Sequence, residues 1–170
     1  MSAVVERYQR LMVYERECGA AVVASLASIA AESRSGADSQ RAMAIAAHVQ
    51  AARLEWLWRL TSYAKALCQR PERLFFESMT ISAAESMTAE ADTAWSGYID
   101  ELTDAELSRV ASYQNTAGRP HSTRVSDIVT HVFNHATYHR GQVAMLVGRA
   151  GGEPAVTDFI FFSYRDPDRA

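Results

Sequence analysis

The sequence of 170 residues has few of the residues that cross-link or interrupt a chain, with two cysteines, four prolines and eight glycines. Cys18 and Cys68 are far apart and neither belongs to a C-x-x-C pair, so we expect no disulfide framework and a reduced, cytoplasmic setting. No apolar run approaches the roughly 20 residues that cross a bilayer. Charges from Glu6 onward are unlike a signal peptide. These absences predict a cytoplasmic protein that does not enter a membrane.

Clustered basic charge is also missing. The chain has 17 basic and 20 acidic residues, with a net charge of −3, and its basic residues are not gathered into a block. Nucleic-acid-binding proteins usually carry a basic patch, so we expect no nucleic-acid partner. The sequence also lacks a G-x-S-x-G motif, a P-loop and a G-x-G-x-x-G motif. Hydrophobic residues make up 48% of the chain, which predicts one domain over residues 1–170 with a core of its own.

Apolar residues recur at helical spacing in four long segments, which predicts helices over 2–32, 39–69, 81–102 and 124–149. Asp38 or Ser39 is expected to cap the second helix, and "SAAE" at 82–85 reads as a capping box for the third. Pro71 is expected to end the second helix, and Gly151 with Gly152 the fourth.

Two shorter segments are ambiguous. Apolar and polar residues alternate around Leu107 and Ala111, and "NTAGRP" supplies turn residues, so a small hairpin or an extended loop precedes the last long helix. The tail "TDFIFFSYRD" is an apolar element that fits either a helix or a strand. The sequence as a whole predicts an all-α fold, an antiparallel four-helix bundle, and such bundles build their sites from side chains on facing helices.

The segment "HVFNHATYHRGQ", residues 131–142, holds three of the five histidines at four-residue spacing: His131, His135 and His139. Residues four apart lie on one face of a helix, and neutral imidazole is a good ligand for zinc and neighbouring divalent ions. Each four-residue step drifts by about 40° around the helix, so one of the three is not expected to be a ligand. Surface or hydrogen-bonded core histidines are the ordinary alternative.

The remaining histidines differ in their surroundings. His121 lies in the predicted turn "GRPHST", where exposure is expected. His48 lies in the middle of the second predicted helix, between Ile45 and Val49, so its ring points at or near the core. A polar ring there needs a partner, which either a metal ion or a buried hydrogen bond would supply.

The segment "HVFNHATYHRGQVAMLVGRAG" resembles the DinB/YfiT-like family of small four-helix metalloproteins, most specifically in its His-x-x-x-His-Arg-Gly-Gln core. "RVASYQNTAGRPHS", "DFIFFSYRD" and "LMVYERECGAAVVASL" are similar to other segments of that family. In that family one histidine of the second helix and two of the last long helix bind a divalent metal. The resemblance implies that His48, His135 and His139 are ligands of one ion, with zinc or nickel favoured, and that His131 packs behind them.

Several members of that family are implied to be transferases that use low-molecular-weight thiols. The resemblance therefore implies a metal-dependent enzyme that activates a bound thiol or water, with a thiol S-transferase as its most specific form. A small-molecule thiol or an electrophilic substrate would be its partner, and a homodimer is plausible for so small a bundle. Two alternatives stay open. One is a non-catalytic metal-binding or stress-response protein with a structural ion, and the other is a dimeric interaction module without stoichiometric metal.

Other side chains have two interpretations each. Glu55, two turns after His48, is either a general base or an ion-paired residue. Arg140 either holds an anionic substrate or pairs with Asp158 or Asp166, and Asn134 could orient a ligand ring. The remaining candidates are expected to pack rather than to react: Trp56, Trp58, Trp95, Tyr138, Cys18 and Cys68.

Overall fold

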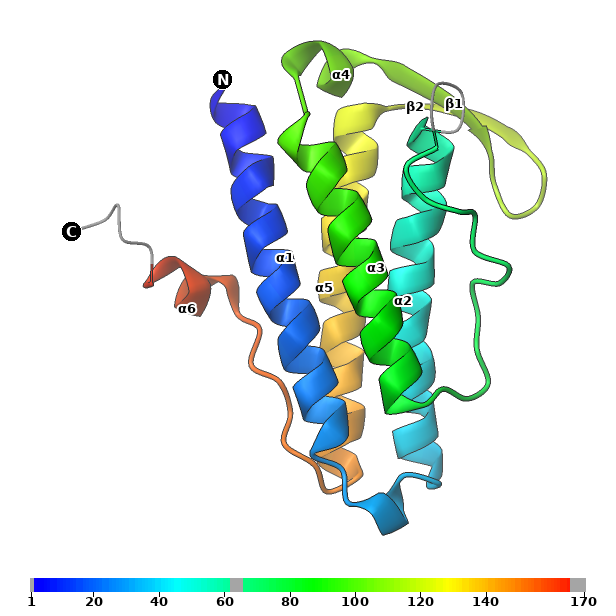
Figure 1. Ribbon diagram of the computed structural model, residues 1–170, viewed down its shortest axis with the longest axis vertical. Helices are drawn as coiled ribbons and strands as arrows, with labels where there is room; N and C mark the ends of the chain where they lie inside the picture. Colours follow the sequence, from blue (N-terminus) through cyan, green and yellow to red (C-terminus); the bar gives the residue numbers. More distant parts are fainter. Residues whose placement is uncertain (1, 62–65, 166–170) are drawn as a thin grey trace.

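Four long helices dominate the computed structural model, which describes residues 2–61 and 66–165 (Figure 1). They are α1 (Ala3–Ala27), α2 (Ala37–Thr61), α3 (Ile81–Asp100) and α5 (Val125–Arg149). The shorter elements are the 3-10 turn η1 (Ala31–Ser33), α4 (Asp104–Ser108), α6 (Phe159–Ser163), and the strands β1 (Val110–Gln114) and β2 (Pro120–Arg124). The predicted all-α bundle is confirmed. No helix in the described ranges is both long and apolar enough to cross a membrane.

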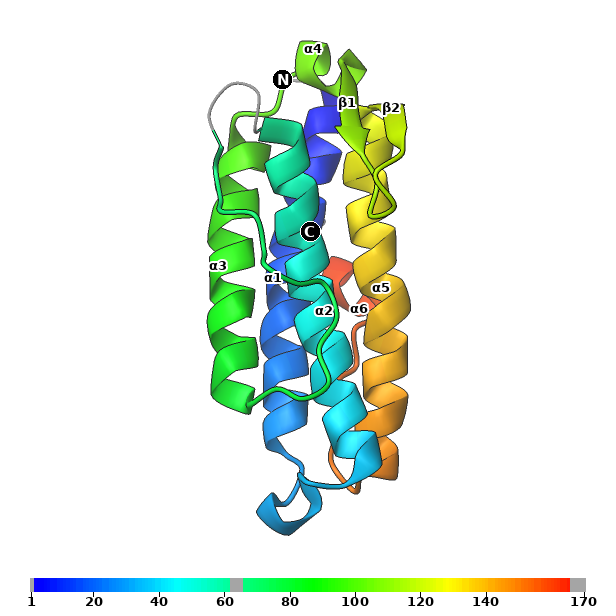
Figure 2. The same cartoon turned by 90° about the vertical axis from the view of Figure 1, so that its right-hand side faces the viewer.

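The direction of the helices places α2 and α5 side by side and antiparallel. In Figure 1, α1 and α5 run downward and α2 and α3 upward, because the connection between α2 and α3 returns along the length of the bundle. Figure 2 shows this connection crossing in front of α2. A long crossover of this kind is an established way to close a four-helix bundle. It leaves one face of the α2–α5 pair covered by a segment without regular structure.

The core is built from the apolar stripes that the helical spacing predicts. Near the top of the bundle Trp95 is 1% exposed and packs with Leu57 and Val129. Its indole Nε1 donates a hydrogen bond to the Arg53 carbonyl at 2.9 Å, so the buried polar atom is satisfied. A second cluster near the bottom includes Leu26. The two clusters fix α2 against its neighbours at both ends.

The helix caps differ from those predicted. α2 begins at Ala37, so Asp38 and Ser39 lie in its first turn, and Ser39 Oγ donates to the Ser33 carbonyl at 2.7 Å instead of capping. The cap of α3 is Thr80, whose side chain accepts a hydrogen bond from the backbone N–H of Ala83. The predicted capping box at 82–85 therefore lies inside the helix. Thr80, and not Ser82, therefore caps α3.

The end of α2 also differs from the prediction. The apolar pattern continues to residue 69, but the helix ends at Thr61; residues 62–65 lie outside the described ranges, and 66–69 are not helical. Thr61 Oγ1 donates to the Leu57 carbonyl at 2.8 Å and accepts from the Leu67 N–H at 3.3 Å. Pro71 therefore does not end this helix as predicted, because residues 66–69 before it are already non-helical.

Both ambiguous segments adopt one of the alternatives left open. β1 and β2 pair antiparallel, with Ala111 opposite Thr123, so the segment is a hairpin. Its turn is closed by Asn115 Oδ1, which accepts two backbone N–H groups, and by Gly118 at φ 74°. The tail forms the short helix α6, and Gly151 at φ 81° follows α5 as predicted. The hairpin lies across the upper ends of α2 and α5 (Figures 1 and 2).

Candidate metal centre

Three of the predicted residues meet between α2 and α5. His48 comes from α2, and His135 and His139 come from α5. Each offers one ring nitrogen, and these three atoms lie within 4.8 Å of one another. The ring centroids are 5.2 Å apart for His48 and His135, 5.0 Å for His48 and His139, and 4.4 Å for His135 and His139. The structure thus brings together the three histidines that the resemblance singled out.

Local sequence explains this convergence. His135 and His139 are one helical turn apart and share a face of α5, while Ala136 and Val143 on an adjoining face are buried in the bundle. His48 follows Ala47, which is fully buried, so small side chains let α2 and α5 approach closely. All three histidines are half-buried, at the edge of the core rather than inside it.

Two of the rings have a fixed tautomer. His48 Nδ1 lies 2.7 Å from the Leu74 carbonyl oxygen, and His139 Nδ1 lies 2.8 Å from Gln142 Oε1. Both oxygens can only accept hydrogen bonds, so each Nδ1 carries the hydrogen and donates it. The lone pair of each ring is then on Nε2, which is free to bind a cation. Phe75 stacks on His48 with ring centroids 4.9 Å apart, which further fixes that imidazole.

The surroundings of His135 and His139 keep these two imidazoles uncharged. Burial, and to a smaller extent the neighbouring His139, His48 and His131, lower the pKa of His135 to about 4. Burial also lowers the pKa of His139, although its hydrogen bond to Gln142 opposes that shift. Near neutral pH these two imidazoles are therefore in the unprotonated form that binds metals.

The donor set fits a divalent ion of the zinc or nickel type, because neutral imidazoles suit both. Two ligand atoms on one ion at about 2.1 Å cannot be more than about 4.2 Å apart. The three nitrogens, within 4.8 Å of one another, therefore need only a small inward shift to share an ion. In the described part of the chain no cysteine, aspartate or glutamate joins the group. Three protein ligands leave a coordination position for another molecule.

The two other histidines lie outside the group, as predicted. His131 is exposed, and its ring is tilted against His135 at 5.5 Å and lies edge-on to Trp56 at 5.3 Å. His121 is exposed in the hairpin, where its Nε2 lies 3.1 Å from Asn115 Nδ2. Neither offers a nitrogen to the three-histidine cluster.

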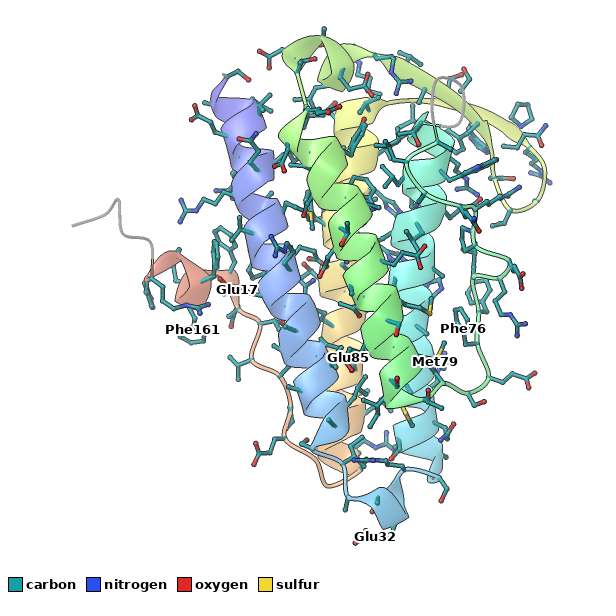
Figure 3. All side chains as sticks on the ribbon, viewed as in Figure 1. Glu17, Glu32, Phe76, Met79, Glu85 and Phe161 are labelled. Carbon is teal, nitrogen blue, oxygen red and sulfur yellow. The ribbon has the colours of Figure 1, made fainter. Side chains whose placement is uncertain are left out.

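Two cavities border the cluster. One of about 420 Å³, here called the upper cavity, is lined by His48, His135 and further residues of α2, the connection and the hairpin. A smaller one of about 110 Å³ is lined by His48, His139, Gln142, Arg41 and Phe76. Figure 3 shows Phe76 on the α2–α3 connection, on the side of the bundle away from Phe161 of α6. The cluster is therefore reachable by a small molecule.

Glu55 lines the upper cavity but is already engaged. Its carboxylate accepts hydrogen bonds from Arg70 Nε at 3.0 Å and Nη2 at 2.9 Å, and it lies 2.9 Å from Arg59 Nη2. The residue is 3% exposed. Of the two predicted interpretations, the ion-paired one describes this contact pattern.

Arg140 does not contact either predicted partner. Its Nη1 lies 2.5 Å from Glu15 Oε2, and both side chains are buried. Its Nη2 donates to the Tyr14 hydroxyl at 3.2 Å. The predicted pairing with Asp158 is therefore wrong, and Asp166 lies outside the described residues. The true partner comes from α1, and this places Arg140 in the core rather than at the histidines.

The other predicted residues divide between the core and the surface. Asn134 lines a cavity on the α1 side with Arg7 and Tyr8, and Gln142 and the Leu74 carbonyl orient the rings instead. Among the residues predicted to pack, Trp95 is in the core, Trp56 lines the upper cavity and Trp58 lies under Arg70. Tyr138 is 66% exposed. Cys18 and Cys68 are free thiols, and burial raises the pKa of both, to about 11 for Cys68.

The fold and the cluster together define a class, that of four-helix bundles with a histidine-built candidate metal centre on two facing helices. Residues 1–169 match the DinB family, and the chain belongs to that family. It is similar to Protein DinB of Bacillus subtilis (strain 168), with 37% identity over 54 residues, which is 32% of this chain and 31% of that relative. The matched stretch thus spans about a third of the relative's length. No solved structure matches the sequence.

Proposed function

We propose that this protein is a divalent-metal-dependent enzyme whose ion is held by His48, His135 and His139. One observation carries the proposal: three imidazole nitrogens lie within 4.8 Å of one another beside a cavity of about 420 Å³. A bound zinc or nickel ion would supply Lewis acidity, lowering the pKa of a thiol or a water molecule in the open coordination position.

The chain's own residues prepare this position. The Leu74 carbonyl and Gln142 hold the Nδ1–H groups of His48 and His139, which leaves both Nε2 lone pairs free for an ion. Burial keeps His135 neutral. Phe75 stacks on His48 and covers one face of that ring. Positioning of this kind costs no reorganisation when a substrate binds.

A low-molecular-weight thiol is the substrate that we favour. In the proposed S-transfer the thiol loses its proton to solvent, its sulfur forms a bond to an electrophilic carbon, and the leaving group departs with the electrons of the broken bond. No protein base is needed for the first step, since the thiol proton is already acidified. Glu55, the carboxylate in the upper cavity, is already engaged by the guanidinium groups of Arg70 and Arg59.

A purely structural ion is the rival proposal. Structural zinc sites are usually closed by four protein ligands. In residues 2–61 and 66–165 no fourth histidine, cysteine or carboxylate joins the cluster, and the upper cavity opens directly on it. These two features favour a site that admits a substrate.

Single alanine variants test the ligand set. Metal content per chain of tag-free protein should fall to background in His48→Ala, His135→Ala and His139→Ala. His131→Ala is the matched control, because this ring touches His135 without joining the cluster. It should keep the metal with an affinity weakened by at most about 10- to 100-fold. Loss of metal in His131→Ala, with retention in His48→Ala, would refute the assignment.

The enzyme proposal has its own test. Metal-loaded protein should accelerate the consumption of a small thiol by an alkyl halide, and His48→Ala should abolish the acceleration while far-ultraviolet circular dichroism stays helical. If all three ligand variants unfold, the ion is a structural staple and the proposal fails. Equal rates with and without metal would also contradict it.

A further inference from the structure

The smaller of the two cavities at the cluster, here called the small cavity, lies where α2 and α5 run side by side (Figure 1). Besides His48 and His139, its polar wall residues are Arg41 and Gln142. Arg41 precedes His48 by seven residues on α2, and Gln142 follows His139 by three on α5. Because the two helices are antiparallel, both polar side chains are displaced from the cluster towards the same end of the bundle. They are therefore placed to act on one ligand.

Both side chains have hydrogen-bond donors that the protein leaves unused. Gln142 Oε1 accepts from His139 Nδ1, while Gln142 Nε2 donates no hydrogen bond in the described part of the chain. Arg41 is exposed, and its guanidinium makes no hydrogen bond, ion pair or ring contact with the described residues. Arg59 of the upper cavity is by contrast paired with Glu55. The donors of the small cavity are therefore available to a ligand.

The charge and the polarity of the small cavity favour an anion with a short apolar part. Among the described residues of its wall there is no aspartate or glutamate, so the positive charge of Arg41 is not compensated there. The rest of the wall is apolar and consists of Ala44, Ile45, Phe75 and Phe76. Attraction between opposite charges is stronger beside apolar groups than in bulk water. A fitting ligand therefore places its anionic group at Arg41 and its carbon atoms along the apolar wall.

We propose that Arg41 and the Gln142 amide bind the carboxylate of a short mercaptocarboxylate in the small cavity, while its sulfur lies at the cluster. This assignment rests on the proposed function and adds the class of substrate: a thiol with a carboxylate a few carbon atoms from the sulfur. A guanidinium can hold a carboxylate through two parallel hydrogen bonds, and an amide N–H adds a further donor. The volume of about 110 Å³ corresponds to a few water molecules, so the carbon chain must be short.

Three matched thiols test the subsite in the cobalt-loaded protein. The probes are 3-mercaptopropionic acid, 3-mercaptopropanol and 3-mercaptopropylamine, whose terminal groups are negative, neutral and positive, and binding is followed by the thiolate-to-cobalt absorption band. We expect the acid to bind about 3- to 10-fold more tightly than the alcohol, between the effect of an exposed ion pair and that of a hydrogen bond to a charged group. The amine should bind more weakly than the alcohol. Because Arg41 is exposed, added salt should reduce both differences.

Variants assign the preference to one side chain. Arg41→Gln should weaken the binding of the acid about 3- to 10-fold and leave that of the alcohol unchanged. Arg41→Glu should reverse the order, so that the amine binds more tightly than the acid. Each thiol is compared with itself in wild type and variant, so differences in thiol acidity between the probes cancel. Arg73→Gln is the matched control, since Arg73 is an exposed cation next to Leu74 that does not line the small cavity. It should keep the full preference.

The outcomes separate this assignment from the proposed function. A preference for the acid that survives in both Arg41 variants would show that its carboxylate binds elsewhere, such as on the cobalt ion, and the subsite would be wrong. An equal loss of preference in Arg73→Gln would show that only the overall charge matters, and would also overturn it. Equal binding of the three thiols to the wild type, with a normal cobalt–thiolate band, would refute the subsite alone. A wild-type protein that binds no cobalt, or that binds cobalt without any thiolate band, would refute the proposed function and the subsite with it.

Discussion

The hydrogen bond between Gln142 and His139 offers a sharp test of how the cluster is prepared. Gln142 Oε1 accepts from His139 Nδ1 at 2.8 Å, and we expect Gln142→Leu to remove this acceptor while keeping the size of the side chain. One neutral hydrogen bond is worth about 0.5–1.5 kcal/mol. Without it the ring is also free to place its hydrogen on Nε2, which removes the ligand lone pair.

The expected loss in zinc affinity is about 10- to 100-fold, the range seen when the partner of a metal-bound histidine is removed. This corresponds to about 1.4–2.7 kcal/mol of binding free energy. Competition against a chromophoric chelator near neutral pH measures it directly. Gln142→Glu should bind zinc at least as tightly as the wild type, because a carboxylate is a stronger acceptor and raises the basicity of the ring.

The control for this experiment is Asn134→Leu. Asn134 lies on the same helix and loses a similar polar group, but it borders the cavity on the α1 side. Its zinc affinity should equal that of the wild type. If Gln142→Leu also binds zinc like the wild type, while His139→Ala does not bind it, tautomer control by Gln142 is refuted.

Three further predictions concern stability. Glu15→Gln should lower the free energy of unfolding by about 3–5 kcal/mol in urea, because it leaves the buried Arg140 charge uncompensated; Glu17→Gln, at an exposed pair, should cost under about 1 kcal/mol, and equal losses would contradict the argument. Since the folded pKa of His135 is lowered to about 4, metal-free protein should lose stability as pH falls from about 6.5 towards 4, with a shallower loss in His135→Ala; identical profiles would contradict this. Gly141→Ala should raise the melting temperature, because an added Cβ meets no atom within 4 Å and alanine favours the helix by up to about 1 kcal/mol; a lower melting temperature would contradict it.

Hydrophobic spacing was enough to predict the four long helices, because each buries a continuous apolar stripe. It predicted too long a second helix, since residues up to 69 keep the spacing although 66–69 are not helical. The Leu67 N–H instead donates to the Thr61 hydroxyl, a contact between residues six apart that no helical spacing encodes. Glu15 stands within the apolar stripe of α1, and its burial depends on Arg140, 125 residues away.

The candidate site was predictable where it depends on side chains in a recurring pattern. The spacing of His135 and His139 indicated a shared face, and the family resemblance added His48. Gln142 was missed as a ring partner, although its position three residues after His139 is the spacing at which helical side chains meet. The Leu74 carbonyl was not predictable, because a backbone oxygen has no residue type to mark it.

The contact between the α2–α3 connection and His48 links the binding of an ion to the docking of this connection on the bundle. Leu74 accepts the hydrogen bond of His48 Nδ1 and Phe75 stacks on the same ring, so a segment without helix or strand holds one corner of the cluster. By thermodynamic reciprocity, an ion that favours this ring orientation must favour the docked segment by the same factor. The rate of amide hydrogen exchange around residue 74 would then report what fraction of the protein holds an ion. A mutation or a protein that draws the segment away would release the ion without touching a ligand.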